Sequence, residues 1–174
     1  VYFVFCQSVS AQNRWAIESD GRIKWDINSS LPHKDHIEMS GERISTVVKY
    51  GVNQDKSFNS SRIIVFPMLR TVPNDTHASL IRQFNWNVAE LINVNSKKTQ
   101  EVVESIELNG FLTVRSILNK NISLIRTMYP SAVNANYCEE YILTNNSEKP
   151  IKIEIPNLSE SYSTNPADGV DGAY

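Results

Sequence analysis

The chain has 174 residues, of which 41% are hydrophobic and 21% are charged, and this composition is typical of a soluble globular domain with a substantial core. It excludes a disordered or collagen-like chain. The 17 basic residues nearly balance the 19 acidic ones, so the charge predicts no binding to nucleic acid or to an anionic membrane.

Residues 1–11 have the pattern of the last part of a secretory signal peptide. Residues 1–6 are continuously apolar, and residues 9–11 are small enough for a signal peptidase to accept. A buried edge strand is the alternative, because a short apolar run does not distinguish the two. We expect an exported protein, periplasmic or extracellular, in which residues 1–11 make few contacts with the mature domain. Cys138 is the only cysteine beyond this segment, so no internal disulfide is expected.

Apolar residues recur at every second position along most of the chain, which predicts β-strands. Asp20-Gly21 separates the first two strands, at residues 15–18 and 22–27. This dipeptide predicts a tight hairpin in which the glycine adopts a positive φ.

The middle of the chain contains two β-branched segments and one ambiguous segment. Strands are expected at residues 44–52 and 62–69, joined by a polar loop. Residues 79–95 also fit a helical stripe, but the four asparagines in this segment favour a strand because they disfavour a helix interior.

The strongest hairpin signal in the chain is Asn109-Gly110, which lies between two β-rich segments. A two-residue loop at this point would set Glu104 opposite Arg115. The opposite charges of these two side chains support that register.

Three further strands are expected at residues 122–129, 137–144 and 151–155, the last two paired as a hairpin. Many short strands without helical segments between them predict an all-β fold, a large antiparallel β-sandwich over residues 12–158. Residues 159–174 lose the periodicity and predict a linker or the start of another segment.

No catalytic residues are predicted, because no pair of carboxylates can face one bond. Glycoside hydrolysis needs two carboxyl groups roughly 5 to 10 Å apart. Glu139 and Glu140 are adjacent, and consecutive side chains on a strand point to opposite faces. A serine-nucleophile motif and a phosphate-binding glycine loop are also absent from the sequence.

Residues 33–38 are the densest group of potential metal ligands, with two histidines and two carboxylates. Their spacing matches no established zinc motif. We therefore expect a polar turn that leads into a strand at Ile37, and no metal or other cofactor.

Three tryptophans, Trp15, Trp25 and Trp86, could stack on a sugar ring, since an aromatic face with a polar edge suits a pyranose. Packing in the core or at a sheet edge is the alternative for each. Trp25 and Trp86 are retained as candidate substrate-binding residues.

Residues 125–131 form an arginine-bearing strand that ends at a Pro-Ser step, and residues 140–147 form a strand that closes on an asparagine turn. With residues 150–155, this succession resembles the β-sandwich module that precedes the (α/α)6 barrel in six-hairpin glycosidases. Residues 35–41 and 66–78 look like secreted Bacteroidetes members of that superfamily. The resemblance implies a sugar-processing protein whose acid and base lie in a helical barrel outside this chain.

The first hypothesis is therefore the non-catalytic N-terminal β-sandwich of an exported glycoside hydrolase. Its partners would be a poly- or oligosaccharide and a downstream catalytic domain of the same chain. A stand-alone carbohydrate-binding or adhesion module is the alternative, and a purely structural interdomain module is a third reading.

A loop at residues 70–77 is the best candidate for the rim of an active site. It concentrates polar side chains that can contact sugar hydroxyls, and loops commonly carry binding residues: Arg70, Asn74, Asp75 and His77. A structural crossover between strands is the alternative.

Overall fold

The computed structural model describes residues 14–28, 32–71, 76–159 and 161, with the backbone alone at 67–71 and 76–79. The expected signal peptide lies outside these ranges, as does most of the expected linker. Strands dominate the described residues, which contain no α-helix and one 3-10 helix. No helix in this part of the chain has the length and apolar character that a membrane span requires.

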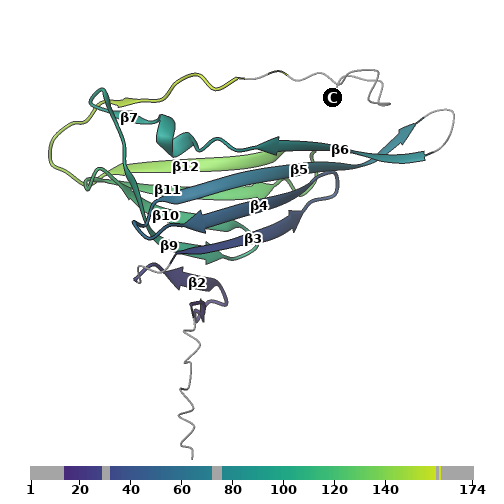
Figure 1. The fold of residues 1–174 in the computed structure, drawn as a ribbon, viewed down its shortest axis with the longest axis horizontal. Coiled ribbons are helices and arrows are strands. Elements are labelled where there is room, and N and C mark those ends of the chain that lie inside the picture. The colour runs from purple at the N-terminus through teal and green to yellow at the C-terminus, as the bar shows by residue number, and fades with distance from the viewer. Residues whose placement is uncertain (1–13, 29–31, 72–75, 160, 162–174) are drawn as a thin grey trace, which may run out of the picture.

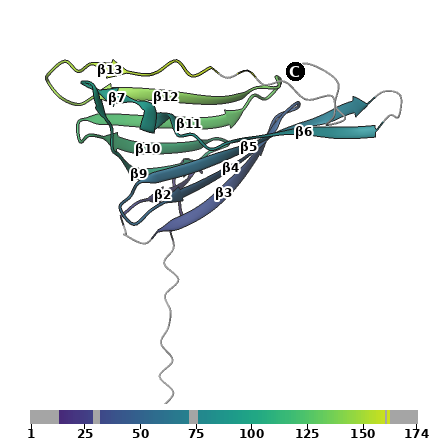
Figure 2. The ribbon, with the colours of Figure 1, turned by 45° about the horizontal axis from the view of Figure 1, so that its top comes forward.

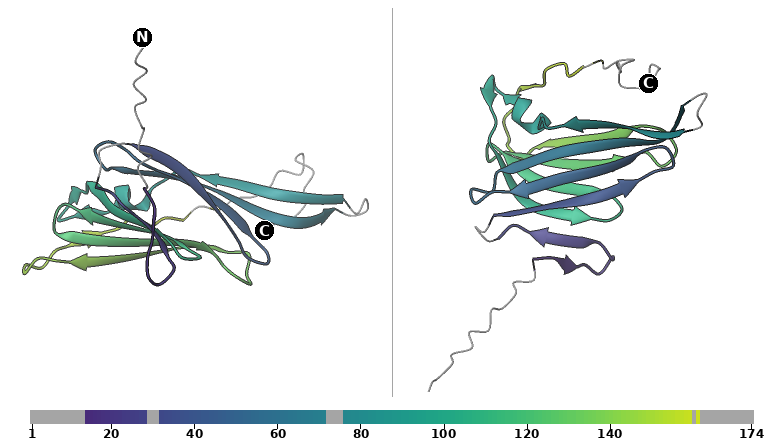
Figure 3. Two further views of the ribbon diagram at one scale, coloured as in Figure 1. Left: turned by 90° about the horizontal axis from the view of Figure 1, so that it is seen from below. Right: turned by 45° about the vertical axis from the view of Figure 1, so that its right-hand side comes forward.

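Two antiparallel sheets stack as the layers of a sandwich (Figures 1 and 3). Sheet A has six strands in the spatial order β1 (Ala16–Ile17), β2 (Ile23–Asp26), β9 (Glu101–Leu108), β10 (Leu112–Leu118), β11 (Ile122–Pro130) and β12 (Tyr137–Asn145). Sheet B has four strands in the order β3 (His33–Ser40), β4 (Ser45–Val52), β5 (Phe58–Thr71) and β6 (Thr76–Phe84). A small sheet C has the order β13 (Ile153–Glu154), β7 (Asn93–Val94) and β8 (Lys97–Lys98). The predicted antiparallel β-sandwich is confirmed.

The main core lies between sheets A and B and is built by alternation along each strand. In β10, Leu112 and Val114 are fully buried while Thr113 between them is half-buried. Val48 and Val52 of β4 face them from sheet B. Fully burying each such side chain stabilises the fold by about 1.5–3 kcal/mol, so this two-residue period drives the association of the layers.

The hairpin expected at Asp20-Gly21 is confirmed. Ile17 pairs with Ile23 across it, and Gly21 has a φ of 85°, a conformation that glycine adopts without steric cost.

The register expected around Asn109-Gly110 is wrong by one residue. Three residues, 109–111, connect the strands, so Leu108 pairs with Leu112 and Arg115 pairs with Ser105. This register buries Leu112 completely and leaves Phe111 49% exposed. A one-residue slip would reverse the face of every side chain in β10, and burial of its apolar set therefore decides the register.

A bulge in β9 removes Glu104 from the pairing that its charge suggested. The ladder shifts between Arg115 and Ser116, which leaves Glu104 without a directly opposed residue. Arg115 instead bonds through Nε to the Glu107 carboxylate at 2.8 Å.

The segment expected as one strand at residues 79–95 is a strand up to Phe84 and again at Asn93–Val94, where β7 lies. A 3-10 helix, η1 (Val88–Leu91), lies between these two strands. Asn87 is the N-cap, and its side-chain oxygen accepts a hydrogen bond from the Ala89 N–H at 3.1 Å. Asparagine disfavours a helix interior but is preferred at the N-cap, so the residue that argued against a helix starts one.

The hairpin expected between the last two strands is wrong, because β13 pairs with β7 and not with β12. Ile153 is opposite Val94, and both pack in a second core with the fully buried Leu118 and Leu124 of sheet A. Sheet C and η1 therefore cover one end of the sandwich, and β12 remains an edge strand.

The hairpin of β5 and β6 extends past the rest of sheet B. Pairing between β4 and β5 ends at Ser45 and Val65, whereas β5 and β6 remain paired as far as Thr71 and Thr76. We call the part of this hairpin beyond Val65 the arm. It projects from the body of the sandwich (Figures 1 and 2).

Candidate functional site

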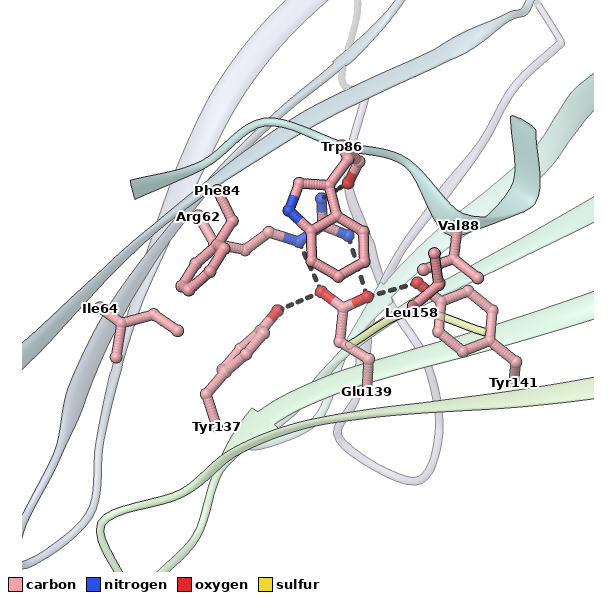
Figure 4. A pocket seen from close by; sticks show the side chains of 9 residues that line it. All are labelled: Arg62, Ile64, Phe84, Trp86, Val88, Tyr137, Glu139, Tyr141 and Leu158. Atoms are coloured by element: carbon pink, nitrogen blue, oxygen red, sulfur yellow. Dashed lines mark hydrogen bonds and ion pairs between the residues drawn. The ribbon is translucent and has the colours of Figure 1, made fainter. Parts of the chain in front are cut away.

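A cavity of about 400 Å³ opens at one edge of the sandwich, where β12 of sheet A faces β5, β6 and the start of η1. We call it the edge cavity. Nine residues line it (Figure 4): Arg62, Ile64, Phe84, Trp86, Val88, Tyr137, Glu139, Tyr141 and Leu158.

Alternation along two strands directs the polar residues of the edge cavity inward. In β12, Tyr137, Glu139 and Tyr141 occupy every second position and are half-buried, whereas Glu140 is exposed. In β5, Arg62 is 3% exposed. The prediction that Glu139 and Glu140 point to opposite faces is confirmed.

Glu139 and Arg62 form a two-pronged ion pair in the cavity (Figure 4). Arg62 Nε lies 2.5 Å from Glu139 Oε1, and Nη2 lies 3.0 Å from Oε2. The hydroxyls of Tyr137 and Tyr141 also donate to the carboxylate, the first at 2.7 Å. The remaining guanidinium nitrogen, Nη1, donates to the Trp86 carbonyl at 2.8 Å. All three nitrogens of the guanidinium group, and both oxygens of the carboxylate, are therefore engaged.

Burial is the largest influence on the Glu139 carboxyl and favours its neutral form. The charge of Arg62, with the hydrogen bonds from Arg62, Tyr141 and Tyr137, outweighs it and holds the pKa of Glu139 below its usual value. Burial, reinforced by the Glu139 charge, raises the pKa of both tyrosines. At neutral pH the carboxylate is therefore ionised and the tyrosines remain hydrogen-bond donors.

This arrangement does not suit acid–base catalysis. A general acid must carry a proton, and a general base needs a free lone pair directed at the substrate. Glu139 is ionised and accepts four hydrogen bonds from protein donors. It acts as a fixed structural element in the floor of the cavity.

The walls of the edge cavity are apolar, and two of their side chains reach solvent. Trp86 is 42% exposed and Leu158 is 39% exposed. Phe84 packs edge-on against Trp86, with 6.2 Å between the ring centroids. An apolar or aromatic group is therefore the ligand chemistry that the cavity fits best.

A second ionic group lies in the interior next to the edge cavity. Arg126 is fully buried and bonds through Nη2 to Glu101 and to Asn87. Its guanidinium lies 4.8 Å from the Phe58 ring centroid and 5.5 Å from that of Tyr141. Tyr141 thus joins the two ion pairs, because its ring contacts Arg126 and its hydroxyl bonds to Glu139.

Of the two tryptophans proposed from the sequence, Trp86 lies at the mouth of the edge cavity and Trp25 does not. Trp25 is 4% exposed and packs in the main core against Trp15 and His33, at centroid distances of 5.8 and 5.3 Å. A ring that is so little exposed presents no face to a sugar. Trp25 is therefore a core residue in this structure.

The loop proposed at residues 70–77 is wrong for Arg70 and His77, which lie in the strands β5 and β6. Arg70 and His77 are directly opposite each other in the ladder of β5 and β6, so the structure brings these two residues together. Asn74 and Asp75 lie outside the described residues.

Residues 33–38 are not the polar turn expected from the sequence, since they belong to β3. Polar and charged side chains are common on such edge strands because they discourage pairing with other chains. Among the residues that the structure describes, no group of three or more histidine, cysteine or acidic side chains could hold a metal ion.

Sequence reasoning missed Arg62, Tyr137 and Tyr141, and considered Glu139 only as one half of a catalytic carboxylate pair, which it rejected. The alternation Tyr-x-Glu-x-Tyr at 137–141 was a usable signal, because it places three polar side chains on one face of a strand. Arg62 had no comparable signal, since its partner lies 77 positions away in the chain.

Comparison with protein-family models, with curated proteins and with solved structures found no match in any of the three.

Proposed function

We propose that this chain is a non-catalytic β-sandwich module of an exported carbohydrate-processing protein, and that a neighbouring domain of the same protein packs on the edge cavity. The resemblance of the sequence to six-hairpin glycosidases suggests an (α/α)6 barrel for that domain. The observation that carries the proposal is the combination, in one cavity, of apolar walls with a polar floor whose groups are already paired.

The paired floor supports a non-catalytic role. Hydrolysis of a glycosidic bond requires one protonated and one ionised carboxyl group at a defined separation. Glu139 is the only carboxylate among the described residues that line the edge cavity, and four donors occupy it.

The apolar walls support a packing role. Trp86 and Leu158 stand at the mouth of the cavity, 42% and 39% exposed, beside Phe84. Exposed apolar groups gathered at one edge are typical of a surface that another domain covers. The arm supports the same role, because a projecting hairpin can carry Arg70 and His77 to the active-site rim of a neighbouring domain.

The test is to assay purified residues 12–174 beside the product of the complete open reading frame, using aryl glycosides and polysaccharides. We expect turnover by the complete product and none by the isolated chain. Turnover by the isolated chain that is lost on replacing one of its Glu or Asp residues would overturn the proposal. An open reading frame that encodes no further domain would also contradict it.

A carbohydrate-binding module is a second candidate, favoured by the exposure of Trp86 beside Phe84. An aromatic face of this kind stacks on a pyranose ring. Affinity electrophoresis of the isolated chain in polysaccharide gels separates the two functions. Retardation of the wild type that is lost in Trp86→Ala supports sugar binding. If the polysaccharide retards neither the wild type nor the variant, packing is supported.

A further inference from the structure

The outer face of sheet B, which is turned away from sheet A, carries a second depression of about 450 Å³. Nine residues from β3, β4, β5 and the segment after β6 line it: Lys34, Asp35, His36, Lys49, Tyr50, Asn59, Ser60, Ser61 and Asn85. We call this depression the outer basin.

The register of sheet B explains why these residues meet. His36, Lys49 and Ser61 are partners in one row across β3, β4 and β5. Val48 and Tyr50, the neighbours of Lys49, are buried in the main core. Strand alternation therefore turns Lys49 and its row away from the core.

Gly51 lies in the next row, where its partners are Lys34 and Asn59. A Cβ at Gly51 would lie 2.7 Å from Asn59 Oδ1, so the absence of a side chain lets the Asn59 amide lie over the strand. Asn59 is held there by a hydrogen bond of 3.2 Å to Asn53. Because strands lie about 4.8 Å apart, the backbones of Lys34 and Asn59 are about 10 Å apart, and the Asn59 amide extends into the space between them.

The two lysines of the basin have no partner for their charge within the described residues. Among the described residues, neither Lys34 nor Lys49 has an ion pair or hydrogen-bond partner at its ammonium group. Asp35 also lines the basin, but its carboxylate accepts the His36 N–H at 2.8 Å and lies 3.5 Å from His33 Nε2 and 4.0 Å from His36 Nδ1. Glu38 is on the outer face but in a different row, opposite Val47.

We propose that the outer basin binds an acidic saccharide unit, one that carries a carboxylate or a sulfate group. The two unpaired lysines supply the attraction for the anionic group. Asn59, Asn85 and Ser61 present amide and hydroxyl groups, which suit sugar hydroxyls as both donors and acceptors. The anionic chemistry follows from the basin itself, whereas the choice of a saccharide rests on the proposed function.

The test is to titrate purified residues 12–174 with three probes by calorimetry: an oligogalacturonate, a heparin oligosaccharide and inorganic sulfate. A neutral cello-oligosaccharide is the uncharged reference. The variant Lys34→Gln/Lys49→Gln removes the two basin charges. Its matched control, Lys97→Gln/Lys98→Gln, removes two exposed charges in β8 and alters the net charge equally.

We expect at least one acidic oligosaccharide to bind, with affinity reduced about tenfold or more in the basin variant and unchanged in the control. Glu38→Gln should strengthen binding, because it removes a like charge from the same face. Equal losses in both double variants, binding of the neutral oligosaccharide with the same affinity, or binding of sulfate alone would each overturn the inference. Failure of the proposed function is identified separately, by the activity comparison with the complete product.

Discussion

At the scale of the residue, the edge cavity depends on the pairing of Glu139 with Arg62. Arg62 is 3% exposed, and removal of its carboxylate partner would leave a buried charge without compensation. We expect Glu139→Gln to lower the free energy of unfolding by about 3–5 kcal/mol, the usual cost of breaking a buried ion pair from one side.

Urea unfolding measures this loss, and Glu140→Gln is the matched control because its side chain is exposed on the same strand. The control should change the free energy of unfolding by less than about 0.5 kcal/mol. Replacing both partners, as in Arg62→Met/Glu139→Leu, should cost less than Glu139→Gln alone, because no charge is then left buried. Equal effects of Glu139→Gln and Glu140→Gln would contradict the pairing.

The same carboxylate predicts how stability depends on pH. The pKa of Glu139 is lower in the folded protein than its ordinary value, so ionised Glu139 stabilises the fold at neutral pH. That contribution is complete above the ordinary pKa of a glutamate and is lost as the pH falls through the folded pKa. We expect the free energy of unfolding of the wild type to fall more steeply than that of Glu139→Gln between about pH 5 and pH 3. Parallel curves for the two proteins over this range would exclude the effect.

At the scale of the element, Gly41 fixes how the turn between β3 and β4 meets the turn between β11 and β12. A Cβ at Gly41 would lie 1.9 Å from the Ser131 carbonyl oxygen, and the neighbouring Glu42 N–H donates to the Ala132 carbonyl at 2.9 Å. The two turns therefore approach each other at the backbone, with no space for a methyl group.

We expect Gly41→Ala to lower the free energy of unfolding by about 1–3 kcal/mol, because overpacking against a rigid backbone forces the turns apart. Thermal unfolding followed by circular dichroism measures the change. Ser40→Ala is the control, since Ser40 is an exposed neighbour. A Gly41→Ala protein as stable as this control would show that the two turns separate without cost.

The elements also show where sequence reasoning succeeds and where it fails. Alternation identified the long strands, because a half-buried strand must alternate whatever its partner is. It did not identify the partners of the strands. β13 pairs with β7 rather than with β12, and β10 is displaced by one residue from its expected register. Pairing is decided by which side chains the whole core buries, and local pattern does not contain that information.

At the scale of the whole molecule, the candidate site could be predicted only in part for the same reason. Trp86 was identified because a tryptophan is a candidate for stacking on a ligand by its residue type alone, without knowledge of its neighbours. The Arg62 to Glu139 pair unites strands from opposite sheets, and its formation depends on how the two layers stack. The outer basin likewise depends on the alignment of three strands, which brings Lys34 and Asn59 to either side of Gly51.

The packing of a neighbouring domain on the edge cavity gives the last prediction, and it rests on the proposed function. If Trp86 is covered in the complete product, Trp86→Asp places a charge in an apolar contact, and desolvating that charge opposes packing. We expect calorimetry of the wild-type product to show one cooperative transition, and the variant to show the sandwich unfolding separately at lower temperature. Ile17→Asp is the matched control, because Ile17 is 81% exposed and lies in β1, at the opposite edge of sheet A from β12. It should leave the transition single. Identical thermograms for the two variants would show that the neighbouring domain does not cover Trp86.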